Sequence, residues 1–305
     1  MSLPGEIHWP KKTQQASHPF LDSTRWDEFP FRDDDIVIAT WAKSGSTWLQ
    51  QIVGQLIFEG PEGGIDVYAI APWVDMRMAP KEELFETLEA QTHRRFVRTH
   101  LPVESLVFSP KAKYLYIARD GRDVLWSLYN HHINLTQEVI DQANALPGME
   151  EHPAAPPPTD VRAFYHDWLD RDGYPLFPYW SHIRSWWDIR DLPNVRLLHF
   201  NNLKADLPGE MRRIANFLAI EVDEALWPVL VEHCTFDYMK EHASEVIAKI
   251  EWFWEGGGKT FIHKGTNGRW RDVLIPADIR KYEAAVKENL APDCVSWLAT
   301  GQLPE

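Results

Sequence analysis

The chain has 305 residues, and its 31 Lys and Arg stand against 45 Asp and Glu, a formal net charge of −14. This acidic balance excludes a general nucleic-acid-binding surface, and an anionic ligand needs local cations that act against the overall charge. A hydrophobic content of 44% with 15 Trp supplies a large core, enough for one large domain.

The predicted elements alternate along the chain after an irregular arm, which we place at 1–34. The predicted strands are 36–40, 95–100, 113–118 and 195–200, and the predicted helices are 48–58, 82–91, a segment ending at 131, and 208–218. This alternation indicates a single α/β domain over 1–305, with a central parallel sheet flanked by helices. Ligands of such sheets bind at the carboxyl ends of the strands. The proline-rich segment 146–160 is either an exposed connector or a lid.

The first predicted strand leads into a segment that reads T-W-A-K-S-G-S-T-W over residues 40–48. A strand, a tight turn and a new helix N-terminus present backbone N–H groups to an anion. Lys43 adds its charge to that of the helix dipole. The order K-S-G-S-T differs from an ATPase loop. A helix capped by Ser46 or Thr47 is the simpler interpretation, but it leaves Lys43 unexplained. Trp48 either stacks on a base or packs in the core.

A second candidate phosphate site follows the third predicted strand. Arg119 stands at the strand end, and Ser127 lies eight residues later, about two turns into the next helix. A guanidinium and a hydroxyl suit a phosphate group. The alternative is a surface ion pair between Arg119 and Asp123, which contributes little stability.

The segment R-T-H-L-P over 98–102 places His100 after the second predicted strand. An imidazole has a pKa near neutrality, so His100 is a candidate general base, and the proline fixes the turn. A structural role is the alternative, because the chain has 13 His.

Glycines flank a basic pair in F-I-H-K-G-T-N-G-R-W over 261–270, which suits a loop around a phosphate or an ordinary surface turn. The preceding G-G-G-K-T over 256–260 ends like an ATPase loop. However, Phe253 stands where the leading glycine belongs, and 251–255 is a poor strand, so we interpret it as a flexible turn.

Together these segments resemble the cytosolic sulfotransferase family, in a bacterial-like form. The family's T-Y-P-K-S-G-T-T-W corresponds to 40–48, and its K-T-H-L-P corresponds to 98–102. Its arginine with a serine eight residues later matches Arg119 and Ser127, and its R-K-G-x-x-G-D-W-K corresponds to 263–271. The resemblance covers nearly the whole chain.

The resemblance implies a P-loop-like architecture and an enzyme that transfers a sulfuryl group from 3′-phosphoadenosine 5′-phosphosulfate (PAPS) to a hydroxyl or amine, releasing 3′-phosphoadenosine 5′-phosphate (PAP) without a metal. His100 is the implied base, Lys43 neutralises the leaving oxygen, and Arg98 completes the catalytic group. In-line transfer of this kind needs alignment and charge neutralisation. The implied donor-binding residues are Lys43, Ser44, Gly45, Ser46, Thr47 and Trp48 at the phosphosulfate, Arg119, Ser127, His263, Lys264 and Gly265 at the 3′-phosphate, and Phe200, Cys234 and Phe236 at the adenine.

Several positions depart from the family pattern. Arg98 replaces a lysine, and His263 replaces an arginine, which predicts weaker or pH-dependent 3′-phosphate binding. Phe200 replaces a tyrosine and Cys234 a threonine, and each change removes a hydroxyl. The family's dimer motif is not matched over 271–280, so we expect a monomer or a different interface.

Two other functions compete with this interpretation. A P-loop nucleotide kinase requires magnesium, whereas a sulfotransferase does not. A non-catalytic nucleotide-binding relative has no need of a positioned base such as His100.

The acceptor is the least defined part of the predicted function. The aromatic residues Trp73, Phe85, Tyr129 and Trp168 line an acceptor pocket or belong to the core, and such a pocket suits a phenol, a hydrophobic alcohol or a glycolipid. We expect no nucleic-acid partner. We find no apolar run of about 18 residues and no secretory signal, and Cys234 and Cys294 fit a reducing compartment, so a cytoplasmic location is expected.

Overall fold

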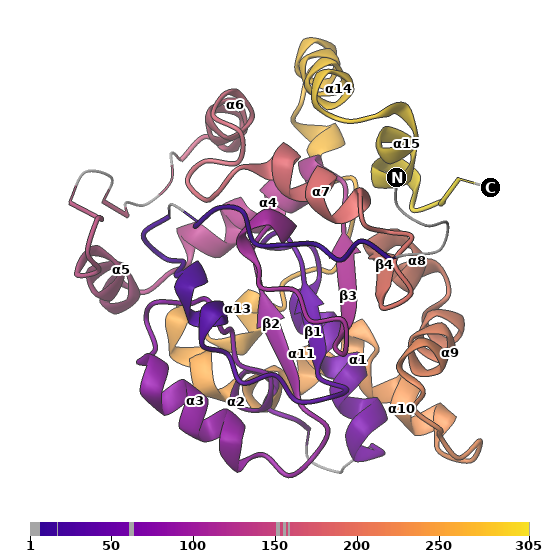
Figure 1. Ribbon diagram of the computed structural model, residues 1–305. Helices are drawn as coiled ribbons and strands as arrows, with labels where there is room; N and C mark the ends of the chain where they lie inside the picture. Colours follow the sequence, from indigo (N-terminus) through magenta and orange to yellow (C-terminus); the bar gives the residue numbers. More distant parts are fainter. Residues whose placement is uncertain are drawn as a thin grey trace.

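The computed structural model describes residues 7–16, 18–60, 64–150, 153–154, 157 and 159–304. A four-stranded sheet with the order β2-β1-β3-β4 forms its centre (Figure 1). The strands are β1 (Ile36–Ala39), β2 (Phe96–Thr99), β3 (Lys113–Ala118) and β4 (Val195–His199). All three pairings are parallel, with Val37 opposite Val97 and Tyr114, which confirms the predicted sheet.

Helices surround the sheet. They are α1 (Ser46–Phe58), α2 (Val67–Ile70), α3 (Lys81–Ala90), α4 (Gly121–Ile133), α5 (Gln137–Asn144), α6 (Val161–Asp170), α7 (Tyr179–Trp187), α8 (Phe200–Ala205), α9 (Leu207–Leu218), α10 (Trp227–His233), α11 (Phe236–Glu241), α12 (Ala243–Val246), α13 (Gly258–Phe261), α14 (Pro276–Asn289) and α15 (Pro292–Thr300). The described residues also contain the 3₁₀ turns η1 (Ser23–Asp27), η2 (Val103–Ser105), η3 (Ala248–Phe253) and η4 (Arg269–Asp272). The helices predicted from the sequence agree to within one or two residues where their bounds were given.

The sheet is covered on both faces, because successive strand residues point to opposite sides. Val37 and Ala39 join a core with residues of α4, α6, α7, α14 and α15. Ile36 and Ile38 join a second core with residues of α1, α9 and α10. Figure 1 shows the sheet enclosed by helices. The strands are therefore rigid supports for whatever follows their carboxyl ends.

The sheet has a switch point beside β1. From β1 the chain passes to β2 on one side and then to β3 on the other. In open parallel sheets the ligand crevice lies at the carboxyl ends of the strands at such a point. Lys43 follows β1, His100 follows β2, Arg119 follows β3 and Phe200 follows β4, as the sequence predicted.

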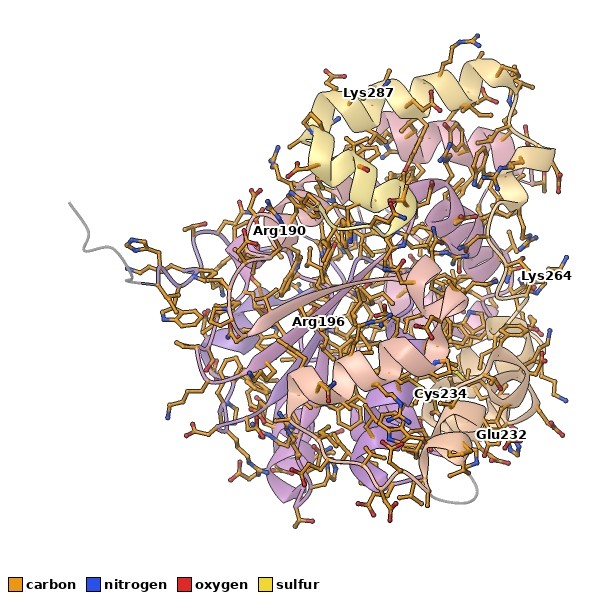
Figure 2. The ribbon with its side chains drawn as sticks, turned by 90° about the vertical axis from the view of Figure 1, so that its right-hand side faces the viewer. Arg190, Arg196, Glu232, Cys234, Lys264 and Lys287 are labelled. Atoms are coloured by element: carbon orange, nitrogen blue, oxygen red, sulfur yellow. The ribbon has the colours of Figure 1, made fainter. Side chains whose placement is uncertain are left out.

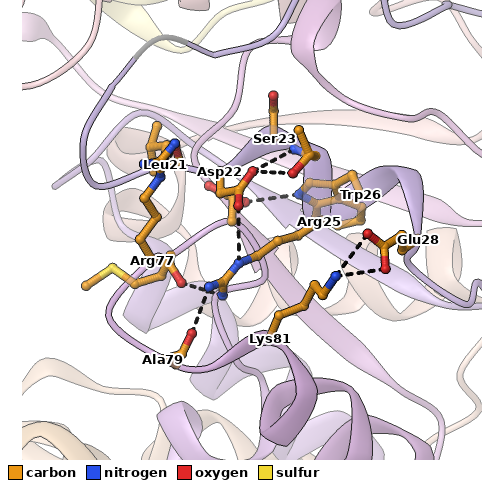
Figure 3. Close-up of polar contacts among 12 residues, drawn as sticks. Leu21, Asp22, Ser23, Arg25, Trp26, Glu28, Arg77, Ala79 and Lys81 are labelled. Carbon is orange, nitrogen blue, oxygen red and sulfur yellow. Dashed lines mark hydrogen bonds and ion pairs between the residues drawn. The ribbon is translucent and has the colours of Figure 1, made fainter. Parts of the chain in front are cut away.

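The N-terminal arm is more ordered than predicted. It contains η1, and Arg25 within it donates hydrogen bonds to the carbonyl groups of Met76 and Ala79, at 2.6 and 2.8 Å (Figure 3). The Trp26 indole donates to Asp75 Oδ1 at 3.2 Å, and Lys81 pairs with Glu28 at 2.8 Å. The prediction of an irregular arm is therefore wrong for 23–27, because these long-range contacts carry no local sequence signal.

A buried ion pair joins the starts of β1 and β2. Arg95 Nε and Nη2 donate to Asp35 Oδ1 and Oδ2 at 2.9 and 2.6 Å, and both side chains are almost fully buried. Replacing Asp35 with alanine leaves the guanidinium buried without its counter-ion. We expect a loss of about 3–5 kcal/mol in the free energy of unfolding, measured by urea denaturation. The surface pair of Asp33 with Lys111 is the control, and Asp33→Ala should cost under about 1 kcal/mol. Equal losses in the two variants would contradict this assignment.

Candidate active site

A cavity of about 1200 Å³ lies at the carboxyl ends of the strands. It is lined by every site residue predicted from the sequence except Ser44 and Cys234: Lys43, Gly45, Ser46, Thr47, Trp48, Arg98, His100, Arg119, Ser127, Phe200, Phe236, His263, Lys264 and Gly265. The four separated sequence segments therefore meet at one place.

The loop between β1 and α1 is a backbone cradle. Gly45 is the N-cap of α1, and no side chain caps the helix, so the alternative of a helix capped by Ser46 or Thr47 is wrong. Thr47 Oγ1 instead bonds to the Tyr68 hydroxyl at 2.9 Å. A Cβ on Gly45, whose φ is +122°, would lie 3.0 Å from Ile117 Cδ1. The uncapped first turn leaves backbone N–H groups that can donate hydrogen bonds to a bound anion.

Lys43 lies at the apex of this loop with a φ of +66°, a conformation that few non-glycine residues adopt. Its Nζ is 3.2 Å from His131 Nδ1 and 4.2 Å from the centre of the Phe261 ring. Burial, with the nearby charges of Arg98 and Arg119, lowers the pKa of Lys43 to about 7. Lys43 is half-buried and lines the cavity. An anion bound here would restore the full charge.

His100 is held in one tautomer. Its Nδ1 is 2.6 Å from the Thr40 carbonyl oxygen, which only accepts, so Nδ1 carries the proton and Nε2 has the lone pair. Its backbone N–H donates to Asp75 Oδ2 at 3.2 Å, and its ring packs edge-on against Trp73. Burial and the Arg98 charge hold the pKa of His100 well below 6.5. The imidazole is therefore neutral at neutral pH, and its Nε2 lone pair is available to accept a proton.

Arg98 lies between two aromatic rings. Its guanidinium carbon is 4.6 Å from the centre of the Tyr68 ring and 4.9 Å from that of Trp73. Planar stacking of this kind suits an arginine better than a lysine. The departure from the lysine in the family motif thus has a local physical reason, although Tyr68 and Trp73 were not assigned to Arg98 from the sequence.

Arg119 is buried, and the two parallel N–H donors of its guanidinium (its fork) bind a neutral oxygen. Its Nε and Nη2 donate to Asn267 Oδ1 at 3.0 and 2.6 Å, and Nη2 also donates to the Thr266 carbonyl at 3.1 Å. The alternative of a surface pair with Asp123 is wrong, because Asp123 instead accepts from the Gly268 N–H at 2.6 Å. The fork has the planar bidentate geometry that suits a phosphate. No sequence signal pointed to Asn267.

The aromatic residues beside this fork divide between the cavity and the core. Trp48 belongs to both the cavity and the core. Its ring packs edge-on against Phe200, and its indole N–H donates to the Cys234 carbonyl at 2.7 Å. The Cys234 side chain, which follows α10 (Figure 2), is buried in the core and does not line the cavity. Only its backbone acts on the site, so its side chain does not occupy the predicted position. Phe236 contacts the cavity and crowds Gly265, where a Cβ would come within 2.4 Å of its ring.

Two lysines anchor the 263–265 segment. Lys240 Nζ donates to the His263 carbonyl at 2.5 Å, and Lys204 Nζ donates to the Gly265 carbonyl at 2.6 Å. Lys264 itself is exposed and projects from the molecule (Figure 2). The segment thus gathers cations at one end of the cavity of an acidic protein.

The G-G-G-K-T segment is a turn at 256–257, as interpreted from the sequence, but 258–260 form the start of the short helix α13, so that interpretation is wrong for these three residues. The 3₁₀ turn η3 precedes it where an ATPase loop has a strand, and Gly256 and Gly257 both have positive φ. Lys259 is exposed on the short helix α13.

The part of the cavity lined by α5 and its neighbours is largely apolar. Its walls include Val139, Ile140 and Ala143 of α5, with Leu128, Leu135, Met149 and Phe164. Among the aromatic candidates, Trp73 lines the cavity, whereas Trp168 is buried in the core and Phe85 and Tyr129 pack against that core. The segment 146–160 lies partly outside the described residues, but its Pro153, Ala154 and Pro157 contribute to the walls.

Comparison with known proteins gives a family match. A family model described as "Sulfotransferase domain" matches residues 33–292. A glycolipid sulfotransferase of Mycobacterium bovis is 30% identical over 306 residues, covering 92% of each chain. Rat sulfotransferase 1A1 is 27% identical over 285 residues, covering 90% of this chain and 89% of its own.

Solved structures of other proteins also resemble the structure of this chain. Retinol dehydratase in complex with androsterone and PAP has a TM-score of 0.68 at 25% identity, over 88% of this chain and 84% of the other. Mouse sulfotransferase SULT7A1 complexed with PAP has a TM-score of 0.70 at 22% identity, over 90% and 92%, a likeness of fold. Within the described ranges, no helix combines the length and apolar character needed to span a bilayer.

Proposed function

The chain belongs to the sulfotransferase family and is a PAPS-dependent sulfotransferase, and we propose that Lys43, His100 and Arg98 form its catalytic group. The observation that carries this assignment is the meeting of two groups in one cavity: the unprotonated Nε2 of His100 and the ammonium of Lys43. A base and a cation at one point suit a reaction in which one oxygen loses a proton and another gains charge.

The residues present fit the donor. The uncapped N-terminus of α1 suits a 5′-phosphate, and the Arg119 fork, which holds the Asn267 oxygen, suits a 3′-phosphate. PAPS, when bound, supplies the sulfuryl group and a bisphosphate leaving group. Ser127, Lys264 and the 263–265 backbone would support the 3′-phosphate, and Trp48, Phe200 and Phe236 would contact the adenine.

The chain's own residues then perform three tasks. His100, held by Thr40 in the tautomer with Nε2 free, takes a proton from the acceptor hydroxyl. Lys43 holds positive charge at the loop where negative charge develops on the leaving oxygen. Arg98, fixed between two rings, adds a second positive charge nearby. Transfer of ³⁵S-labelled sulfate from PAPS to an alcohol, resolved by chromatography, tests the assignment, and variants at these positions with undiminished rates would refute it.

Metal removal separates this function from the kinase alternative. Charge at the leaving oxygen is neutralised here by side chains, so we expect the sulfuryl-transfer rate to change by less than about twofold when EDTA replaces magnesium. The control is phosphoryl transfer from ATP with magnesium to the same acceptor, for which we expect no product. Loss of sulfuryl transfer in EDTA, restored by magnesium, would contradict this prediction.

For the acceptor, we propose a hydrophobic alcohol or a glycolipid whose apolar part lies along α5. The cavity of about 1200 Å³ exceeds the roughly 300–1,000 Å³ usual for one ligand, as expected where a nucleotide and an acceptor bind together. The walls from α5 and Leu135 are apolar except for Gln142, and one relative is named a glycolipid sulfotransferase. A panel of phenols, long-chain alcohols, steroids and glycolipids tests this proposal, and a preference for small charged acceptors would refute it.

Two further assignments stay proposals. We propose that the chain is a monomer, or a dimer joined elsewhere than at 271–280, because the family's dimer motif is not matched there. A dimer by sedimentation that dissociates on mutation of 271–280 would refute this. We also propose a cytoplasmic location, in keeping with two buried free cysteines, and cell fractionation tests it.

A further inference from the structure

His131 is a polar contact of Lys43 that the proposed mechanism does not use. It lies on α4, one turn after Ser127, so both residues face the cavity from the same side of the helix. Its Nδ1 is 3.2 Å from Lys43 Nζ. Burial and the Lys43 charge hold the pKa of His131 well below 6.5, so the imidazole is neutral, the ammonium donates and Nδ1 accepts.

The His131 ring is itself held in place. Its centre lies 5.2 Å from that of Trp254 and 6.3 Å from that of Phe261, both edge-on. Phe261 also lies under the Lys43 ammonium. An imidazole acceptor and an aromatic face therefore fix the end of a flexible four-carbon stem, which otherwise samples many rotamers.

We propose that His131 is a positioning residue for sulfuryl transfer, which holds the Lys43 ammonium in the cavity in its charged form. This inference rests on the proposed role of Lys43. The mechanism assigned above requires a charged Lys43, and a hydrogen bond accepted from an ammonium stabilises that charge.

The other groups around Lys43 oppose its charge or leave it unchanged. Arg98 from β2 and Arg119 after β3 repel the ammonium. The remaining titratable neighbours are His100, after β2, and His132 on α4, whose pKa values are lowered by burial and which are neutral at neutral pH. Loss of the His131 acceptor should therefore lower the pKa of Lys43 further below its ordinary range.

Two variants separate positioning from packing. His131→Leu removes the acceptor, while His131→Asn keeps an amide oxygen near the place of Nδ1. A Lys43 pKa lowered by one unit corresponds to a tenfold loss of the charged form at high pH. For His131→Leu we expect kcat/KM for PAPS to fall about tenfold relative to the natural chain near pH 8, but less than about threefold near pH 6. His131→Asn should stay within about threefold throughout.

A titration of the Lys43 side chain by ¹³C NMR, in protein without nucleotide, gives a readout that does not depend on turnover. We expect its midpoint to fall by about one pH unit in His131→Leu and to stay in place in His131→Asn. An unchanged midpoint in His131→Leu, or a pH profile parallel to that of the natural chain, would overturn the proposal. If the natural chain transfers no sulfate at all, the proposed function fails, while the NMR midpoint still tests the contact.

Discussion

Replacing His100 with alanine is expected to lower kcat for sulfuryl transfer by about 100- to 10,000-fold, the usual contribution of a positioned general base. The reason is the fixed tautomer: the Thr40 carbonyl binds the protonated Nδ1 and directs the lone pair of Nε2 to the cavity. PAP affinity, measured by isothermal titration calorimetry, should change by less than about threefold, because the proposed phosphate contacts come from other residues.

A matched variant tests whether His100 acts as a base or as a packing group. His100→Asn keeps an N–H that can donate to Thr40 but has no basic nitrogen, so it should be as inactive as the alanine variant. His166→Ala, on the outer helix α6 beside Asp278, should retain full activity. Substantial turnover by His100→Asn would show that the side chain only supports the fold.

The pH profile follows from the same environment. His100 works only when neutral, and burial together with Arg98 lowers its pKa well below 6.5. Activity should therefore be retained as the pH falls through 6.5 and be lost only when the pH reaches the lowered pKa.

Replacing Lys43 with methionine is expected to lower kcat/KM for PAPS by at least about 100-fold, a typical loss for one group that stabilises transition-state charge. Methionine keeps the length of the side chain and removes the charge. Because the pKa of Lys43 is lowered to about 7, kcat/KM for PAPS in the natural chain should fall as the pH rises above about 7. The corresponding fall in kcat should occur at a higher pH, because the phosphates of the bound donor favour the charged form of Lys43.

Lys259 provides the control for this variant. It occupies the lysine position of the ATPase-like segment, yet it is exposed on α13 and no strand leads into that segment. Lys259→Met should leave sulfuryl transfer within about twofold of the natural rate. If Lys259→Met is inactive and Lys43→Met is active, the two loops have been assigned the wrong way round.

The parts of the fold that the sequence predicted are those with local signals. The strands around 36–40 and 113–118 are apolar runs followed by glycine and charged residues. Both the strands and the polar groups at their ends could therefore be predicted from the sequence. The positions of Lys43, His100 and Arg119 at one edge then follow from parallel strands.

The missed contacts are those between distant residues. Asn267 meets Arg119 across 148 residues, and Arg25 reaches Ala79 across 54. His131 had a usable signal, its spacing of four residues from Ser127 on a helix. Aromatic content alone could not separate Trp168, which lies in the core, from Trp73, which lines the cavity, because a large ring fits a core and a pocket equally well.

The central claim is that one cavity transfers sulfate from PAPS by means of Lys43 and His100. The most direct measurement is single-turnover transfer of ³⁵S-labelled sulfate from PAPS, in EDTA, by the natural chain, His100→Asn and Lys43→Met, with a long-chain alcohol as acceptor. The account predicts labelled product from the natural chain and at least about 100-fold slower formation from both variants. Equal single-turnover rates in all three proteins would contradict it.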